Sequence, residues 1–195
     1  DNIGNAFGPH AAINSDGNIM VMWYQDDGTY SNVWVCSFTV GVGWGEPQLL
    51  QVYPVSDAFD PQVAIDDLGN AIAVWTQFNG QHDNIWANRF VADSGSGAAT
   101  CIQANQEAQA GHPKIMMDAN GNAVPHWEQC DTDGDHYWSS HYPSDTGWHA
   151  AVKREAYNPS HAFGAQASTD AHGYHLTFWD QLSRKFGNIW SETMR

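Results

Sequence analysis

Short apolar segments separated by turn signals run along the chain, and the clearest set lies between residues 61 and 103. Residues 61–65 are apolar and lead into the turn signal Asp-Asp-Leu-Gly-Asn. Residues 71–77 are apolar on both faces, residues 84–90 alternate between apolar and polar positions, and a Gly-rich turn precedes a weaker segment at 99–103. This pattern predicts four β-strands, the second of which is covered on both sides.

The same pattern recurs every 52 residues without an insertion. Two tryptophans, a glutamine and a glycine keep this step in all four copies: Trp23, Trp75, Trp127 and Trp179; Trp34, Trp86, Trp138 and Trp190; Gln25, Gln77, Gln129 and Gln181; Gly17, Gly69, Gly121 and Gly173. A period of this length predicts four copies of one supersecondary unit. We expect the tryptophans in contacts between copies and the glycines at positive φ in hairpin turns.

Four antiparallel strands per repeat are typical of a β-propeller blade. We therefore predict an all-β chain that forms one four-bladed β-propeller over residues 1–195, with blades at about 6–57, 58–109, 110–161 and 162–195. Because the fourth copy stops after its third strand, we expect a three-stranded last blade that closes the ring. A fragment of a larger propeller and an association of two chains fit the same pattern.

The charge is strongly negative. Lys and Arg total 7 against 22 Asp and Glu, which gives a formal net charge of −15 at pH 7 and disfavours nucleic acid and membrane-surface partners. No stretch approaches the roughly 20 apolar residues of a membrane span, and Asp1 is expected to be a mature or trimmed start. Few lysines and many Asn, Gly, Ser and Trp residues favour a secreted or outer cell-surface location. Only one disulfide can form among Cys36, Cys101 and Cys130.

The motif Pro-x-Val-Ala-Ile-Asp-x-x-Gly-Asn-Ala-x-Ala-Val-Trp at residues 61–75 resembles the repeats of secreted bacterial propellers related to the sialidase-like and BNR families. The resemblance implies the propeller fold. Sialidases carry three arginines that bind a carboxylate, and Ser-x-Asp-x-Gly-x-x-Trp boxes. This chain lacks the boxes and has no arginine on a predicted inner strand. Sialidase activity is therefore not expected.

Eight of the ten histidines lie in blades three and four. Several of them stand at repeat positions where the other copies have a different type of residue. His126 stands where the other copies have Met22, Val74 and Phe178, a position that is normally apolar. Other substituted or flanking positions are held by His112, His136, His161 and His175. A buried imidazole needs a partner, and either a copper or zinc ion or an ordinary hydrogen bond to a carbonyl or carboxylate would supply one.

The high content of His and Trp resembles that of methanotroph surface proteins of the MopE and CorA type. In that group two histidines and a tryptophan oxidised to kynurenine hold copper(I). His136 and Trp138 are two residues apart and share one strand face, so they are the preferred pair. The full candidate metal set is His136, Trp138, His126, His112, His161 and His175.

A calcium site is a further possibility in blade three. Asp131, Asp133 and Asp135 alternate like the opening of a Ca²⁺ loop, although Tyr142 stands where that loop has its last Glu. Ordinary turn chemistry explains the same residues equally well.

Three functions compete. The sequence predicts first a secreted, non-catalytic propeller that binds copper for metal acquisition, with a metal ion as partner and the oligomeric state open. The alternative is a lectin-like module in which Trp44 and Trp148 stack on a small glycan. An enzyme ranks third because no known catalytic motif appears, and Glu128 and Asp180 are interpreted as polar residues at the channel rim.

Overall fold

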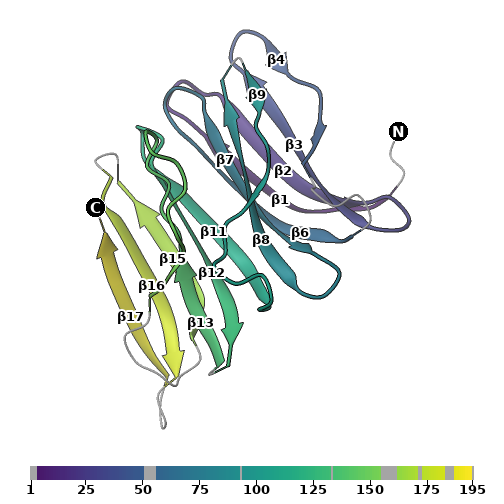
Figure 1. Cartoon of the computed structure of the whole chain (residues 1–195). Helices are drawn as coiled ribbons and strands as arrows, with labels where there is room; N and C mark the ends of the chain where they lie inside the picture. The colour runs from purple at the N-terminus through teal and green to yellow at the C-terminus, as the bar shows by residue number, and fades with distance from the viewer. Residues whose placement is uncertain are drawn as a thin grey trace.

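The computed structural model describes residues 4–50, 56–92, 94–132, 134–154, 162–170, 173–182 and 187–194. These ranges form β-strands and turns, without a helix, and the strands make four antiparallel sheets (Figure 1). Each sheet corresponds to one predicted repeat. Along the chain the colours of Figure 1 pass from one blade to the next, from purple to yellow.

The strand bounds follow the 52-residue period. Blade 1 contains β1 (Ala6–Ile13), β2 (Ile19–Asp26), β3 (Ser31–Thr39), β4 (Gly43–Trp44) and β5 (Gln48–Leu49). Blade 2 contains β6 (Ala58–Ile65), β7 (Ala71–Phe78), β8 (Asp83–Val91), β9 (Gly95–Ser96) and β10 (Thr100–Cys101). Blade 3 contains β11 (Ala110–Met117), β12 (Ala123–Asp131), β13 (Gly134–Ser139) and β14 (Val152–Lys153). Blade 4 contains β15 (Ala162–Thr169), β16 (His175–Leu182) and β17 (Gly187–Met194).

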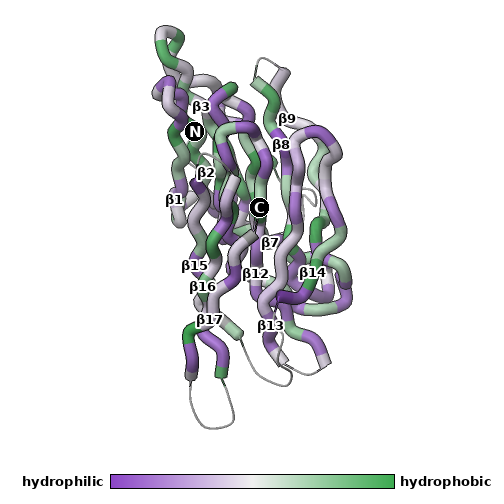
Figure 2. The backbone as a smooth tube through the Cα atoms, turned by 90° about the vertical axis from the view of Figure 1, so that its left-hand side faces the viewer, coloured by the Kyte–Doolittle hydropathy of each residue, from purple (hydrophilic) through white to green (hydrophobic). Residues whose placement is uncertain are grey.

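The two tryptophan series face each other within each blade. Trp75 of β7 is paired with Trp86 of β8, and the equivalent residues pair in the other three blades. The recurring glutamine has a structural role, since Gln77 accepts a hydrogen bond of 3.3 Å from the indole N–H of Trp75. Hydrophilic and hydrophobic segments follow one another along the tube in Figure 2.

The hairpin turn between the first two strands of each blade explains the recurring glycine. Its φ is 82° at Gly17, 83° at Gly69, 83° at Gly121 and 82° at Gly173, as predicted. A Cβ on Gly121 would lie 2.8 Å from a carboxylate oxygen of Asp66 in the preceding blade. The glycine is therefore required both by its backbone conformation and by close approach between blades.

Buried contacts join consecutive blades. Met22 of blade 1 packs in one cluster with Trp75 of blade 2, and Val74 of blade 2 with Trp127 of blade 3. Tyr137 of blade 3 stacks on Trp179 of blade 4, with ring centroids 5.3 Å apart. These contacts confirm that the second-strand tryptophans of blades 2, 3 and 4 lie in the interfaces between blades.

Four blades and a three-stranded last blade are confirmed, but the expected ring closure is not found. Within the described ranges, strands of blades 1 and 2, of blades 2 and 3, and of blades 3 and 4 pack extensively, whereas no strand of blade 4 packs extensively on blade 1. As far as the chain is described, the four sheets therefore form an open arc, because a closed ring requires contact between the first and last sheets.

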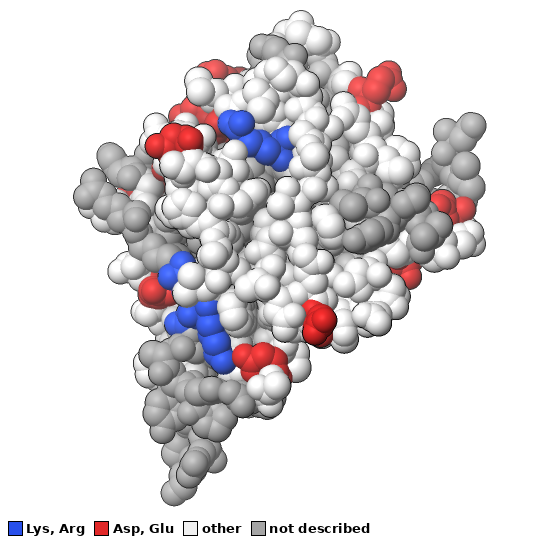
Figure 3. All heavy atoms as spheres, viewed as in Figure 1, with Lys and Arg blue, Asp and Glu red and all other residues white. Residues whose placement is uncertain are grey.

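Two further sequence expectations concern the cysteines and the surface. Cys36, Cys101 and Cys130 are all free thiols. The part of the chain that is described has no helix long and apolar enough to cross a bilayer. On the face shown in Figure 3, basic side chains form only a few small groups among acidic ones, as the net charge of −15 requires.

Candidate functional site

Each blade has a β-bulge near the start of its innermost strand, at the repeat position of residues 8, 60, 112 and 164. The residue there has positive φ in every blade: Gly8 (56°), Asp60 (51°), His112 (53°) and Gly164 (67°). Among the described residues, only Asp60 and His112 combine a positive φ with a side chain. Such strain is costly and concentrates at functional sites.

These two strained residues border a cavity of about 410 Å³ between the inner strands of blades 2, 3 and 4, which we call the axial cleft. Its polar lining consists of Asp60, Gln62, His112, Lys114, His126, Glu128 and Gln166. A smaller cavity of about 280 Å³ adjoins it, and Asp60, His112 and Glu128 line both. The three residues therefore lie where the two cavities meet.

Glu128, on β12, is held in place from two blades. One carboxylate oxygen, Oε1, accepts a hydrogen bond of 2.8 Å from the backbone amide of Gly164 in blade 4. The other, Oε2, lies 3.2 Å from Nδ1 of His112 on the neighbouring strand β11. The side chain of Glu128 is 24% exposed and that of His112 is 72% exposed. Glu128 is thus fixed in orientation yet open to solvent.

Asp180 is a second carboxylate beside Gly164. It occupies on β16 the repeat position that Glu128 occupies on β12, and a Cβ on Gly164 would lie 3.3 Å from its Oδ2. The glycine lets its backbone approach both carboxylates closely. Glu128 lines the axial cleft, and Asp180 lies beside Gly164, which lines it too.

His126 lies deep in the axial cleft and is 1% exposed. Neither ring nitrogen has a hydrogen-bond partner within the described ranges. Burial, followed by the positive charge of Lys114, lowers the pKa of His126 to about 3. The imidazole is therefore neutral near pH 7.

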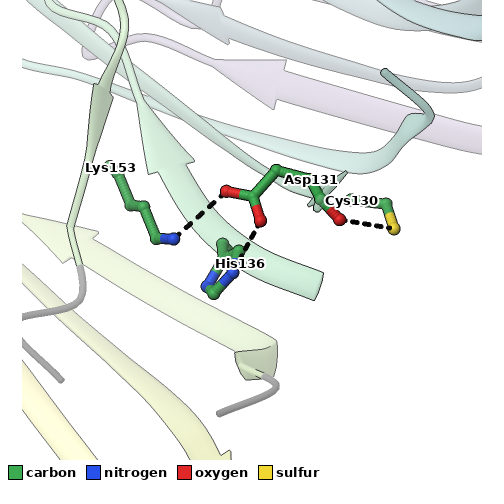
Figure 4. Close-up of polar contacts among 4 residues, drawn as sticks. All are labelled: Cys130, Asp131, His136 and Lys153. Carbon is green, nitrogen blue, oxygen red and sulfur yellow. Dashed lines mark hydrogen bonds and ion pairs between the residues drawn. The ribbon is translucent and has the colours of Figure 1, made fainter. Parts of the chain in front are cut away.

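His136 is fully buried, and its Nε2 lies 3.0 Å from a carboxylate oxygen of Asp131. The second oxygen of Asp131 lies 3.1 Å from Nζ of Lys153, as Figure 4 shows. Nitrogen atoms of His136 and Lys153 therefore already contact both carboxylate oxygens of Asp131, the first residue of the predicted calcium loop. Asp135 is exposed, and Asp133 lies outside the described residues.

His175 is buried on β16 in a third location, with its ring centroid 6.4 Å from that of His141. Burial is the largest cause of the lowered pKa of both histidines. Trp138 is half-buried on β13, and His161 lies outside the described residues. Among the described members of the predicted metal set, His112 and His126 both line the axial cleft, and His136 and Trp138 lie two residues apart on β13.

In the described ranges, no group of three or more His, Cys, Asp or Glu side chains is arranged to hold a metal ion. Copper and calcium therefore remain predictions. Of the two candidate stacking residues, Trp44 is 60% exposed, whereas Trp148 is half-buried with its ring 4.8 Å from that of Tyr142.

Sequence reasoning missed Asp60. Its signal was present in the aligned positions 8, 60, 112 and 164, which read Gly, Asp, His and Gly. A polar residue that replaces glycine at a fixed repeat position indicates a side chain kept despite backbone strain.

The chain matches no known family model, and the search of curated proteins found no significant relative. Its fold is similar to that of an endo-arabinase from Bacteroides thetaiotaomicron VPI-5482, with TM-score 0.57, 14% identity, and coverage of 100% of this chain and 78% of that one. A second similar structure belongs to the GH130 family of mannoside phosphorylases, which contains glycoside hydrolases that target β-1,2 mannosidic linkages. It matches with TM-score 0.53, 12% identity, and coverage of 97% of this chain and 66% of that one. A polysaccharide lyase matches with TM-score 0.52, 10% identity, and coverage of 94% and 48%.

These similarities confirm the propeller fold on which the resemblance to secreted bacterial propellers depends. The relationships to sialidase-like and to copper-binding surface proteins stay predictions. They also correct the prediction of a non-catalytic protein, because the similar structures are enzymes that act on glycans. At 10–14% identity, the chain is shown to share the β-propeller fold of these carbohydrate-active proteins.

Proposed function

We propose that this protein is a carbohydrate-active propeller that binds a glycan in the axial cleft and cleaves a glycosidic bond there. The observation that carries the proposal is the placement of strained Asp60 and His112 beside Glu128, at the edge of a cavity formed by three blades. The propeller fold does not require either of these strained side chains, because glycine occupies the equivalent bulge position in blades 1 (Gly8) and 4 (Gly164).

Asp60 and Glu128 supply the two carboxyl groups that glycoside hydrolysis requires. One carboxyl donates its proton to the bridging oxygen as the bond from the anomeric carbon to that oxygen breaks. The other, as carboxylate, removes a proton from water, whose oxygen forms the new bond to the anomeric carbon. The contacts from His112 and from the Gly164 amide hold Glu128 in one orientation, which keeps it positioned for reaction.

The rest of the lining suits a sugar. Gln62, Lys114 and Gln166 offer hydrogen-bonding groups to hydroxyls from three inner strands. The similar folds support this choice, as does the lectin-like alternative from the sequence. Secretion or display at the outer surface accompanies the proposal, since polymeric glycans are extracellular substrates.

The test is turnover on arabinan, mannan and a uronate-containing polysaccharide, measured as release of reducing ends. Absorbance of unsaturated products separates elimination from hydrolysis. We expect cleavage of at least one polymer, lost in Asp60→Asn and in Glu128→Gln and kept in Asp16→Asn, which alters an exposed carboxylate in the hairpin turn of blade 1. Cleavage that is unchanged in both cleft variants would contradict the proposal. Glycan binding without any cleavage would exclude its catalytic part.

A further inference from the structure

The polar lining of the axial cleft divides into two groups. Asp60, His112 and Glu128 lie at the edge shared with the smaller cavity. The other polar residues line the axial cleft alone and carry no carboxylate: Gln62, Lys114, His126 and Gln166. Each of these four side chains can donate a hydrogen bond from nitrogen. One part of the cleft therefore holds the two carboxyl groups of the proposed reaction, and the other part holds nitrogen donors.

Lys114 is a half-buried cation that has no carboxylate partner in the part of the chain that the structure describes. The other basic side chains there are engaged. Lys153 and Arg154 each contact a carboxylate, at 3.1 Å and 3.6 Å, and Arg89 lies over an aromatic ring. A single charged side chain in a ligand cavity commonly sets the specificity of the site, so an unpaired ammonium group here indicates an anionic ligand.

Comparison of the blades shows that the fold does not require a lysine at this position. Lys114 on β11 is paired with His126 on β12, so the two side chains share one face of the sheet. In the other blades the equivalent pair joins one polar and one apolar residue: His10 and Met22, Gln62 and Val74, and Gln166 and Phe178. The described residues supply neither a carboxylate for Lys114 nor an acceptor for His126.

We propose that the glycan bound in the axial cleft is acidic, and that Lys114 binds a negatively charged group on one of its sugar units. This inference rests on the proposed function, because it names the substrate class of the same site. A uronate carboxylate or a sulfate ester would supply the charge. The amides of Gln62 and Gln166 donate hydrogen bonds to the same sugar unit, while Asp60 and Glu128 act on the bond at the edge of the cleft.

The size and charge of the protein determine which ligands are suitable probes. The axial cleft of about 410 Å³ lies within the usual range for ligand sites, roughly 300–1,000 Å³. The net charge of −15 repels a long polyanion, although salt at about 0.15 M limits that repulsion to roughly 8 Å. Short oligosaccharides with few charges are therefore the appropriate ligands.

Calorimetry with matched charged and neutral ligands tests the inference. The probes are galacturonate, guluronate and glucuronate trisaccharides, each as the free acid and as the methyl ester, and a sulfated galactose trisaccharide with its desulfated form. We expect at least one charged probe to bind about tenfold tighter than its neutral form, the usual net effect of one hydrogen bond to a charged group. Comparison of the uronate and sulfate pairs identifies the group that carries the charge.

Lys114→Gln, which introduces the residue of blades 2 and 4, should remove this preference, so that charged and neutral forms bind about equally. The matched control is Lys153→Gln, which alters a lysine on β14 that does not line the axial cleft and should keep the preference. Circular dichroism checks that each variant is folded. Lys114→Met provides a second uncharged variant of similar length if Lys114→Gln is not.

Equal affinity for charged and neutral forms in the wild-type protein, or a preference that survives in Lys114→Gln, would overturn the inference. Cleavage of a neutral polymer would then still support the proposed function. A charge preference that depends on Lys114, without cleavage of any polymer, would support the inference and exclude the catalytic part of the proposed function. Binding of no probe would overturn the inference and mean that water alone solvates Lys114 in the cleft.

Discussion

The first two strands of each blade form a hairpin with a turn at one end and a β-bulge at the other. Both ends require positive φ, but they differ in the residues that they use. At the turn end, all four blades use glycine, at residues 17, 69, 121 and 173. At the bulge end, blades 1 and 4 use glycine, whereas blade 2 uses Asp60 and blade 3 uses His112. Backbone geometry alone therefore explains the turn end but not the choice of residues at the bulge end.

The difference separates positions that serve the fold from positions that serve a site. A side chain at positive φ costs on the order of 1 kcal/mol or more. In blade 3 this cost accompanies a contact between His112 and Glu128, and in blade 2 it brings a carboxylate to the same cavity. Four predictions test this division, from the largest expected effect to the smallest.

Glu128→Gln should have the largest effect, on the bulge side of the comparison. Loss of the ionisable group should reduce glycosidic turnover by about 100-fold or more, the usual contribution of a general acid or base. The amide keeps the shape of the side chain and can still accept the Gly164 N–H bond, so glycan affinity should change far less. Turnover and affinity are measured separately, by initial rates and by calorimetry. Turnover within a few-fold of wild type would mean that the bulge end is not the reactive site.

His126→Val tests the middle of β12. There a histidine that lines the axial cleft stands where blades 1 and 2 have the buried apolar residues Met22 and Val74. The folded-state pKa of His126, about 3, lies below its unfolded value of 6.5, so the unfolded chain binds a proton first and stability falls as pH drops below 6.5. Between pH 7 and pH 4 this one group should cost about 3 kcal/mol in the free energy of unfolding. His126→Val, with the residue of blade 2, should remove that part of the pH dependence in denaturant titrations. An unchanged slope would show that His126 does not stay neutral in the folded protein.

Gly121→Ala tests the turn end. The added methyl would meet a carboxylate oxygen of Asp66 at 2.8 Å, at a φ of 83°, so the free energy of unfolding should fall by about 2 kcal/mol. Gly41→Ala is the matched control, since it has a φ of 81° and nothing within 4 Å of the added Cβ. Thermal melts of both variants isolate the contact between blades. Equal losses would assign the whole effect to backbone strain.

Asp60→Gly should give the smallest change in stability and the opposite sign. Relief of strain at a φ of 51° outweighs the extra freedom of glycine in the unfolded chain, for a net gain of about 0.5 kcal/mol. The same variant should lose glycosidic turnover. Chemical denaturation and polymer cleavage are both measured on this variant. A loss of stability would identify Asp60 as a structural residue and remove the contrast with Gly8 and Gly164.

Most of the fold was predictable because it repeats. The strand pairs, the facing tryptophans and the turn glycines all follow from side-chain types at a fixed period, and each is found where the period places it. The candidate site was predictable only in part. Glu128 and Asp180 were predicted to be rim residues, but Asp60 was missed because nothing local marks a bulge and its signal appears only when the four repeats are aligned.

The histidines show the limit of reasoning by substitution. Their replacement of standard residues suggested a shared metal pocket, yet His126, His136 and His175 lie at three separate places. Two of them are on different strands of one blade, and the third is in another blade. Convergence depends on strand pairing and side-chain direction, which a list of substituted positions does not contain.

Sequence by itself determined that this protein is built from four equivalent antiparallel sheets. Apolar strand segments and turns that repeat every 52 residues can bury their apolar side chains in few other ways. Only the tertiary structure decided that Asp60, His112 and Glu128 meet at one cavity. The reason is physical. Local periodicity sets how each sheet forms, whereas the distance between residues of different blades depends on how the sheets pack.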